Sequence, residues 1–392
     1  MLTNNIKFKN FSIKKKKSNT LKIYKKLISN YHSDNKKQIL KSLSKNYQYS
    51  FNKKSISKYK KLNNFRIIGM GGSILGAEAI YNFLKKKIKK NFYFLNNLQS
   101  FNKSSLSNNQ DLNIVISKSG NTLETIANSN IFIKKNQKSI FILENKNSYL
   151  KKIAEKLKAE VIEHNNFIGG RYSVLSEVGM LPAELMGLDE GKFKQLNSLI
   201  KNKNFFKNLI NNVDATLSLI KKKKYSSVIL NYDENSESLF KWYQQLIGES
   251  LGKKSKGLLP VISNMPKDNH SLMQFYLDGP QKNFYTFFNV LENNKDIMKI
   301  KSERIIKSHA YLKNKSLQEI LNAQKKATEK VFISKKLPFR SFEIIKRNEE
   351  TMGQLFSFFI IETILLGKLL KVNPFDQPSV ELIKTETKKI FK

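Results

Sequence analysis

The sequence of 392 residues contains no cysteine, and it has few arginines and few acidic residues. Without cysteine it can form no disulfide, no thiolate nucleophile and no zinc ribbon. Only five arginines occur, and 31 Asp and Glu residues stand against 71 Lys and Arg, which gives a formal net charge of +40. Such a charge can indicate a nucleic-acid partner, but proteins that read nucleic acid depend on the planar fork of arginine. The lysine excess therefore favours a bias of composition, and we expect no specific nucleic-acid partner.

Long apolar runs are also missing. The first residues contain no apolar stretch of roughly 7–15 residues, as a secretory signal would require. The most apolar run, residues 355–370, contains Glu362 and Lys368 and falls short of the roughly 20 apolar residues of a membrane span, so it indicates a buried helix. With 40% hydrophobic residues the chain can bury a core. We expect a cytoplasmic protein with no membrane partner and about two or three domains.

The order of the predicted elements indicates an α/β fold. Short β-rich runs alternate with helical stretches of 10–15 residues, which is the pattern of parallel strands joined by crossover helices. The predicted strands are residues 65–69, 113–116, 139–143, 161–162, 227–230, 258–262 and 285–291. The predicted helices are residues 75–87, 122–134, 148–158, 237–252, 315–331 and 350–371. We therefore expect two three-layer α/β/α domains with mainly parallel sheets, and helical segments at both termini.

The changes in composition along the chain place the boundaries of these parts. Residues 1–62 are rich in lysine but keep regular apolar positions, which predicts a helical extension. The expected parts are this extension, a first α/β domain over 63–190, a helical connector over 191–225, a second α/β domain over 226–345 and a C-terminal helical segment over 346–392.

Two loops rich in small residues follow consecutive predicted strands. Residues 69–73 include three glycines, among them Gly72, followed by Ser73; they lack the third glycine of a dinucleotide fingerprint, but they let a ligand approach the backbone. Residues 117–122 bring the hydroxyls of Ser117, Ser119 and Thr122 to the start of a helix. Either loop alone can be a plain turn or a helix cap. Because both leave the carboxyl ends of neighbouring strands, we expect them to form one anion site.

Arg171 is a third candidate, because it follows two glycines in a chain that has few arginines. A guanidinium can stabilise an oxyanion or an enediolate that develops during a reaction. The alternative is a structural arginine that pairs with a carboxylate. The sequence around it leaves both interpretations open.

Four blocks, in family order, resemble the glucose-6-phosphate isomerase family. Residues 169–179, read as GGRYSVLSEVG, resemble its Gly-Gly-Arg-aromatic-Ser segment, and residues 375–384, read as FDQPSVELIK, resemble its C-terminal signature. Residues 245–253 and 269–274 resemble its other two active-site segments, and the two serine-containing loops resemble the phosphosugar loops of sugar-isomerase (SIS) domains. Glu177 and Ser379 depart from the pattern, since small residues are usual at the first position and Gly or Ala at the second.

The resemblance implies an enzyme that interconverts glucose 6-phosphate and fructose 6-phosphate through an enediol, on two SIS-type domains. Transferred to the matching positions, Glu249 would be the base, Arg171 would stabilise the intermediate, and His270 would assist ring opening with Lys384 nearby. The residues expected to bind substrate are Gly72, Ser73, Ser117, Lys118 (mainly through its backbone), Ser119, Thr122, Gln245 and Gln377. Proton transfer through an enediol requires no metal, and no His, Asp or Glu cluster has metal-ligand spacing, so we expect no metal and no cofactor.

The resemblance also implies a homodimer in which the segment of His270 enters the active site of the partner. Three alternatives remain at this point. A related isomerase that also accepts mannose 6-phosphate would use the same base. A non-catalytic phosphosugar-binding module would keep the serine loops and lack Glu249 and His270 in context. A nucleic-acid-binding protein would account for the charge, but the chain has no arginine cluster.

Overall fold

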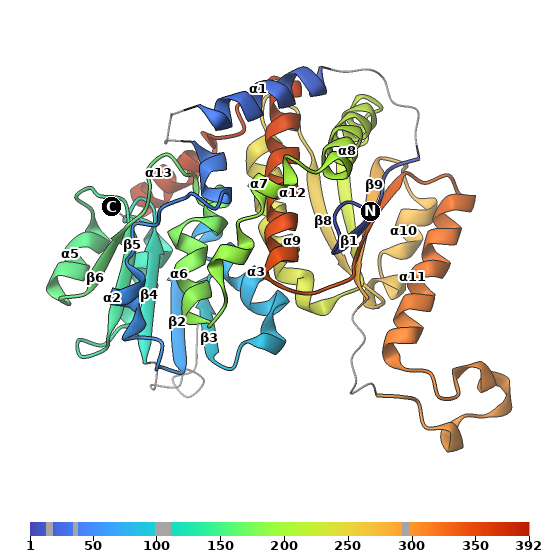
Figure 1. Cartoon of the computed structure of the whole chain (residues 1–392), viewed down its shortest axis with the longest axis horizontal. Helices are drawn as coiled ribbons and strands as arrows, with labels where there is room; N and C mark the ends of the chain where they lie inside the picture. Colours follow the sequence, from blue (N-terminus) through green and yellow to red (C-terminus); the bar gives the residue numbers. More distant parts are fainter. Residues whose placement is uncertain (13–18, 34–37, 99–110, 292–297, 392) are drawn as a thin grey trace.

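The computed structural model describes residues 1–12, 19–33, 38–98, 111–291 and 298–391, and these form two sheets that lie side by side (Figure 1). The first sheet has the strand order β3-β2-β4-β5-β6 and is parallel throughout. Its strands are β2 (Asn64–Gly69), β3 (Asn91–Leu95), β4 (Leu112–Ser117), β5 (Ser139–Leu143) and β6 (Glu160–Glu163). Its helices are α3 (Leu75–Phe83), α4 (Leu123–Phe132), α5 (Tyr149–Lys156) and α6 (Glu177–Leu185).

Helices cover both faces of the first sheet, and the alternation of side chains along its strands decides what each face contacts. Ile67 and Ile114 point into a core shared with α3 and α6, whereas Ile68 and Val115 point into a second core shared with α4 and α5. All six residues of β4 are buried. Strands buried on both faces are mostly continuous apolar runs, which is why the central strands β2, β4 and β5 could be predicted from the sequence.

The second sheet has the strand order β1-β10-β9-β7-β8, in which only the pairing of β1 with β10 is antiparallel. Its strands are β1 (Ile6–Lys9), β7 (Ser226–Asn231), β8 (Leu259–Asn264), β9 (Asn283–Val290) and β10 (Phe339–Ile344). Its helices are α8 (Lys203–Lys221), α9 (Glu237–Leu251), α10 (Met273–Asp278), α11 (Leu317–Ser334) and α12 (Glu349–Leu369). The remaining helices are α1 (Thr20–His32), α2 (Lys53–Ser57), α7 (Leu196–Leu199) and α13 (Val380–Ile390).

A single core joins the two sheets. It contains inward residues of both sheets together with side chains of α3, α6, α9 and α12, and Figure 1 shows α3, α9 and α12 between the sheets. A smaller core under α10 and α11 covers the outer face of the second sheet. The predicted class, α/β layers with mainly parallel sheets, is therefore confirmed.

The helix α12 is the buried helix that the sequence predicts. In the described part of the chain it is the only helix long and apolar enough to cross a membrane, but nearly all of it is buried inside the protein. Glu362, its one buried acid near the middle, pairs with the buried Arg340 of β10. Of the two charged residues in the apolar run, Glu362 thus has a partner in the core.

The prediction that residues 1–62 are a helical extension is wrong for its first part. Ile6–Lys9 form the edge strand β1, in which Ile6 is buried while Lys7 and Lys9 are exposed. Four alternating residues are too few to reveal a strand by their period, and the exposed lysines match the Lys-rich surroundings. Strands β3 and β10 were also not predicted. Strand β10 is almost fully buried, but Arg340 interrupts its apolar pattern in the sequence.

Candidate active site

The two loops of the predicted anion site leave the same edge of the first sheet. Strands β2 and β4 are parallel neighbours, and Gly69 lies opposite Ile116 at their carboxyl ends. In the second loop the hydroxyls of Ser117 and Thr122 lie 3.1 Å apart, and the Ser119 hydroxyl accepts a hydrogen bond from the backbone N–H of Asn121. Small neutral donors therefore gather at the start of α4, where helix N–H groups also point outward.

The side chain of Lys118 turns away from these hydroxyls. Its ammonium donates to the carbonyl oxygen of Asn166 at 2.7 Å and lies 3.6 Å from Glu144. Burial lowers the pKa of Lys118 below its usual value. This position agrees with the expectation that Lys118 acts mainly through its backbone.

The first loop packs directly against the Arg171 segment and against α9. A Cβ atom added at Gly72 would lie 2.1 Å from the carbonyl carbon of Gly170, and one added at Gly71 would lie 2.7 Å from Nε2 of Gln245. The backbone of residues 71–72 therefore has no room for side chains. This close approach connects the loop of the first sheet to the helix that carries Glu249.

We expect Gly72→Ala to destabilise the protein by ~3 kcal/mol, because the added methyl meets backbone atoms that cannot rotate away. Urea unfolding of the purified protein measures this change. Gly248→Ala is the matched control, since an added Cβ at Gly248 has no heavy atom within 4 Å and alanine favours the helix. Equal stability of Gly72→Ala and the native protein would contradict the packing described here.

Arg171 is the centre of the site, and its side chain is only 2% exposed. It belongs to the 3₁₀ turn Gly170–Leu175, in which all residues after the glycine are buried. All five N–H groups of a guanidinium are used here. Nε donates to Ser250 Oγ (2.8 Å), Nη1 to Glu249 Oε2 (3.0 Å) and Gln377 Oε1 (2.8 Å), and Nη2 to the carbonyls of Pro374 (2.8 Å) and Asp376 (2.9 Å).

Glu249 lies on α9 with a side chain that is 30% exposed. One carboxylate oxygen accepts from Arg171, and the other accepts from Nε2 of Gln245 at 2.9 Å. Gln245 and Glu249 are four residues apart and therefore share one face of the helix. The amide oxygen of Gln245 is buried and has no hydrogen-bond partner among the described residues.

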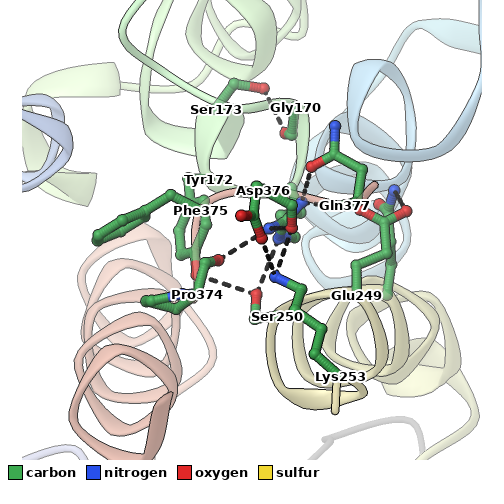
Figure 2. Close-up of polar contacts among 12 residues, drawn as sticks. Gly170, Tyr172, Ser173, Glu249, Ser250, Lys253, Pro374, Phe375, Asp376 and Gln377 are labelled. Atoms are coloured by element: carbon green, nitrogen blue, oxygen red, sulfur yellow. Dashed lines mark hydrogen bonds and ion pairs between the residues drawn. The ribbon is translucent and has the colours of Figure 1, made fainter. Parts of the chain in front are cut away.

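Figure 2 shows how the residues around Arg171 converge: Glu249 and Ser250 come from α9, Gly170 and Tyr172 from the 3₁₀ turn, and Pro374 to Gln377 from the segment before α13. The structure thus brings together Arg171, Glu249, Gln245 and Gln377 from three predicted blocks. The two interpretations of Arg171 meet here, because the carboxylate with which it pairs is the predicted base.

His270 and Lys384 lie outside this arrangement. His270 is exposed at the end of the 3₁₀ turn Lys267–His270. The side chain of Lys384 is 62% exposed on α13 and pairs with Glu381 at 2.7 Å. Among the described residues neither contacts Arg171 or Glu249, so their catalytic roles stay predictions. No three His, Asp or Glu side chains of the described residues gather as metal ligands, and the expectation of no metal also stays a prediction.

Several residues of the site were not predicted from the sequence. The hydroxyl of Tyr172 lies 2.9 Å from Ser250 Oγ and donates to the carbonyl of Pro374 at 2.8 Å. Lys253 and Asp376 form an ion pair of 2.7 Å at the same place. Tyr172, Ser250, Lys253 and Asp376 lie within the blocks that resemble the isomerase family, but nothing in the sequence separates these four from their neighbours.

The unusual residue Glu177 has a structural role. It is fully buried at the start of α6 and accepts hydrogen bonds from the hydroxyl of Tyr47 (2.8 Å) and the backbone N–H of Asn165 (2.9 Å). Its carboxylate therefore attaches the segment before α2 to the first domain. Ser379, the other departure, immediately precedes α13.

Comparison with known proteins agrees with the geometry. The sequence profile of the phosphoglucose isomerase family matches residues 32–392. The chain is 33% identical over 361 residues to a glucose-6-phosphate isomerase of Methanocaldococcus jannaschii, covering 86% of each chain. It is 34% identical over 352 residues to that of Mycoplasmopsis pulmonis, covering 83% of this chain and 82% of the relative.

Two solved structures share the fold. A hypothetical protein from Thermus thermophilus superimposes with a TM-score of 0.82 at 23% identity, covering 95% of this chain and 94% of that one. A glucose-6-phosphate isomerase from Chlamydia trachomatis superimposes with a TM-score of 0.72 at 19% identity, covering 86% of this chain and 71% of that one. This chain and the two solved structures therefore share the same fold.

Proposed function

The chain belongs to the phosphoglucose isomerase family and interconverts glucose 6-phosphate and fructose 6-phosphate, and we propose that Glu249 is the base of this reaction. The reaction moves a proton between C2 and C1 through an enediol, which requires a positioned carboxylate. The observation that carries the proposal is the fixed orientation of Glu249. Both of its oxygens are held, by Arg171 at 3.0 Å and by Gln245 at 2.9 Å, while 30% of the side chain stays accessible.

Arg171 stabilises the enediolate in this proposal. Because all its N–H groups are engaged, a substrate oxygen must replace one acceptor, and the amide of Gln377 on Nη1 is the one beside Glu249. Gln377 is exposed at the end of the segment 373–377, and its side chain can turn away. Its amide and the unpartnered oxygen of Gln245 then bind sugar hydroxyls.

The phosphate binds at the carboxyl edge of β2 and β4, held by neutral donors. The hydroxyls of Ser73, Ser117, Ser119 and Thr122 and the N–H groups at the start of α4 supply these donors. Gly72 lets the loop that carries Ser73 pack closely against the Arg171 segment. A dianion held by hydroxyls and helix N–H groups needs no lysine ammonium in contact. The position of the Lys118 ammonium, bound to the Asn166 carbonyl, supports this division.

We propose further that the enzyme is a cytoplasmic homodimer with shared active sites. His270 would then open the sugar ring in the partner's site, with Lys384 nearby. The exposure of His270, and the lack of any contact with Glu249 in the described part of its own chain, support this arrangement.

Mixed dimers test the shared site. We expect His270→Ala and Glu249→Gln homodimers each to lose most activity, whereas a random mixture of the two chains regains about one quarter of it, because half the dimers are mixed and each has one intact site. Chains that carry different affinity tags are co-expressed, and the mixed dimer purified through both tags should show about half of the native activity, because one of its two sites is intact.

The control is a mixture of Glu249→Gln with Arg171→Lys. Both changes affect the same half of the site, so no intact site can form. Activity of the His270 mixture no higher than that of this control would exclude a shared site.

Conversion of fructose 6-phosphate to glucose 6-phosphate by the purified protein tests the function itself. Mannose 6-phosphate, assayed in parallel, measures whether the enzyme also accepts that sugar. Binding of both sugars without turnover would instead indicate a non-catalytic phosphosugar-binding module.

A further inference from the structure

Lys253 is a lysine that the structure turns inward. It lies two residues after the end of α9 and four residues after Glu249, and only 13% of its side chain is exposed. An ammonium has three N–H donors, and all three are used on one turn. They bind the carbonyl oxygens of Asn373 and Asp376 and, at 2.7 Å, the carboxylate of Asp376.

The local backbone aims Lys253 at this turn. At Gly252 an added Cβ would lie 2.7 Å from the carbonyl oxygen of Gly248, so the chain can leave α9 tightly only with glycine there. The next residue then projects toward the segment between α12 and α13. Figure 2 shows the ammonium of Lys253 reaching Asp376 from the side of α9.

The same turn is the one that Arg171 holds. Residues 373–377 lie outside helices, so their carbonyls lack helical partners. Arg171 donates to the carbonyls of Pro374 and Asp376, and the carbonyl of Asp376 accepts from both cations. The turn is thus held by two positive side chains, Arg171 from the 3₁₀ turn 170–175 and Lys253 from just after α9, and its last residue is Gln377.

We propose that Lys253 is a positioning residue of the isomerase, holding the 373–377 turn so that Gln377 and the start of α13 keep their places beside Glu249. The proposal rests on the function proposed above. Lys253 touches no expected substrate atom. Its role is to keep the turn in place when a substrate oxygen replaces Gln377 on Arg171. The three hydrogen bonds of the Lys253 ammonium can persist in that state, because Arg171 donates none of them.

The two backbone carbonyls that Lys253 binds should matter more for activity than its ion pair with the Asp376 carboxylate. The carboxylate of Asp376 is 51% exposed, so water weakens its ion pair. The hydrogen bond from Lys253 nevertheless lowers the pKa of Asp376, which keeps the pair ionised at neutral pH. The two backbone carbonyls remain after Asp376→Asn but lose their donor in Lys253→Met, so the lysine substitution should have the larger effect.

The test is steady-state kinetics of the full-length enzyme with fructose 6-phosphate. We expect Lys253→Met to lower kcat/KM about 30-fold, mainly through kcat, since small misplacements at a catalytic site cost up to about 100-fold. Asp376→Asn should lower it only about 3-fold, and Lys253→Arg should restore most of the activity. Lys254→Met, which removes the exposed lysine one residue further on, is the matched control and should leave kcat/KM unchanged.

The Gln377→Ala background distinguishes positioning of the turn from a general effect of Lys253 on stability. If Lys253 acts through the turn, Lys253→Met should cost much less in the Gln377→Ala background than in the native one. Equal losses in the two backgrounds, or a Lys253→Met enzyme as active as Lys254→Met, would overturn the proposal. If Lys253→Met does not fold, the same comparison is made with Asp376→Asn. Absence of turnover in the native enzyme would contradict the proposed function instead.

Discussion

Glu249→Gln is expected to lower kcat for the conversion of fructose 6-phosphate by about 10³-fold, which is the range for loss of a positioned general base. Glutamine keeps the size of the side chain and can still bond to Gln245 and Arg171, but it cannot take a proton from carbon. The KM for fructose 6-phosphate should change little, because the phosphate binds on the other loops. A coupled assay that measures glucose 6-phosphate gives both constants.

Glu237→Gln is the matched control, because Glu237 is a partly exposed glutamate on the same helix that pairs with Lys241 at 2.9 Å. It should leave kcat unchanged. Thermal unfolding of both variants checks that neither loses its fold. A Glu249→Gln enzyme that keeps more than a tenth of the native kcat would exclude this residue as the base.

The fold could be predicted where the amino-acid pattern is local. Strands such as β4 are apolar on both faces, and the helices between them carry clear apolar faces. The prediction failed for β1, where Lys7 and Lys9 conceal the alternation, and for β10, where the buried Arg340 is paired with a residue of α12 that is distant in sequence. Both errors involve contacts between segments far apart in the chain.

The site could be predicted only in part for the same reason. Arg171 drew attention because arginine is rare in this chain, whereas Glu249 and Lys384 were found only through the family resemblance. Lys253 is one of many lysines, and its inward position depends on the sharp turn at Gly252 and on carbonyls more than a hundred residues away. The proposed role of His270 depends on a second chain, and the pattern of one sequence does not show which residues meet between chains.

Because acids are few, several inward lysines bind backbone carbonyls. With 31 Asp and Glu against 71 Lys and Arg, carboxylates cannot pair every cation. Lys194, which is fully buried, donates to the carbonyls of Ser42 and Leu175, and burial lowers its pKa to about 7. Lys118 and Lys253 likewise bind carbonyls. These three lysines hold irregular backbone in place, whereas the buried Lys325 pairs with Glu329 and Glu343. The lysine excess therefore has structural consequences beyond surface charge.

Arg171→Lys is expected to lower kcat/KM by about 10²–10³-fold, the usual cost of removing a donor from an oxyanion site. Lysine keeps the charge but offers three donors in place of five, so it cannot bind Ser250, Glu249 and the 373–377 turn together. The loss should appear mainly in kcat, because the enediolate carries more charge than the substrate. Binding of a sugar-phosphate carboxylate that mimics the enediolate should weaken by a similar factor.

Arg304→Lys, at an exposed position, is the control and should change neither quantity. The comparison separates the two interpretations of Arg171 that the sequence leaves open. If Arg171 only supports the turn, its replacement should weaken binding of substrate and of the enediolate mimic to the same extent. If it stabilises the intermediate, the mimic should lose far more affinity than fructose 6-phosphate, because only the mimic carries the charge that the guanidinium recognises.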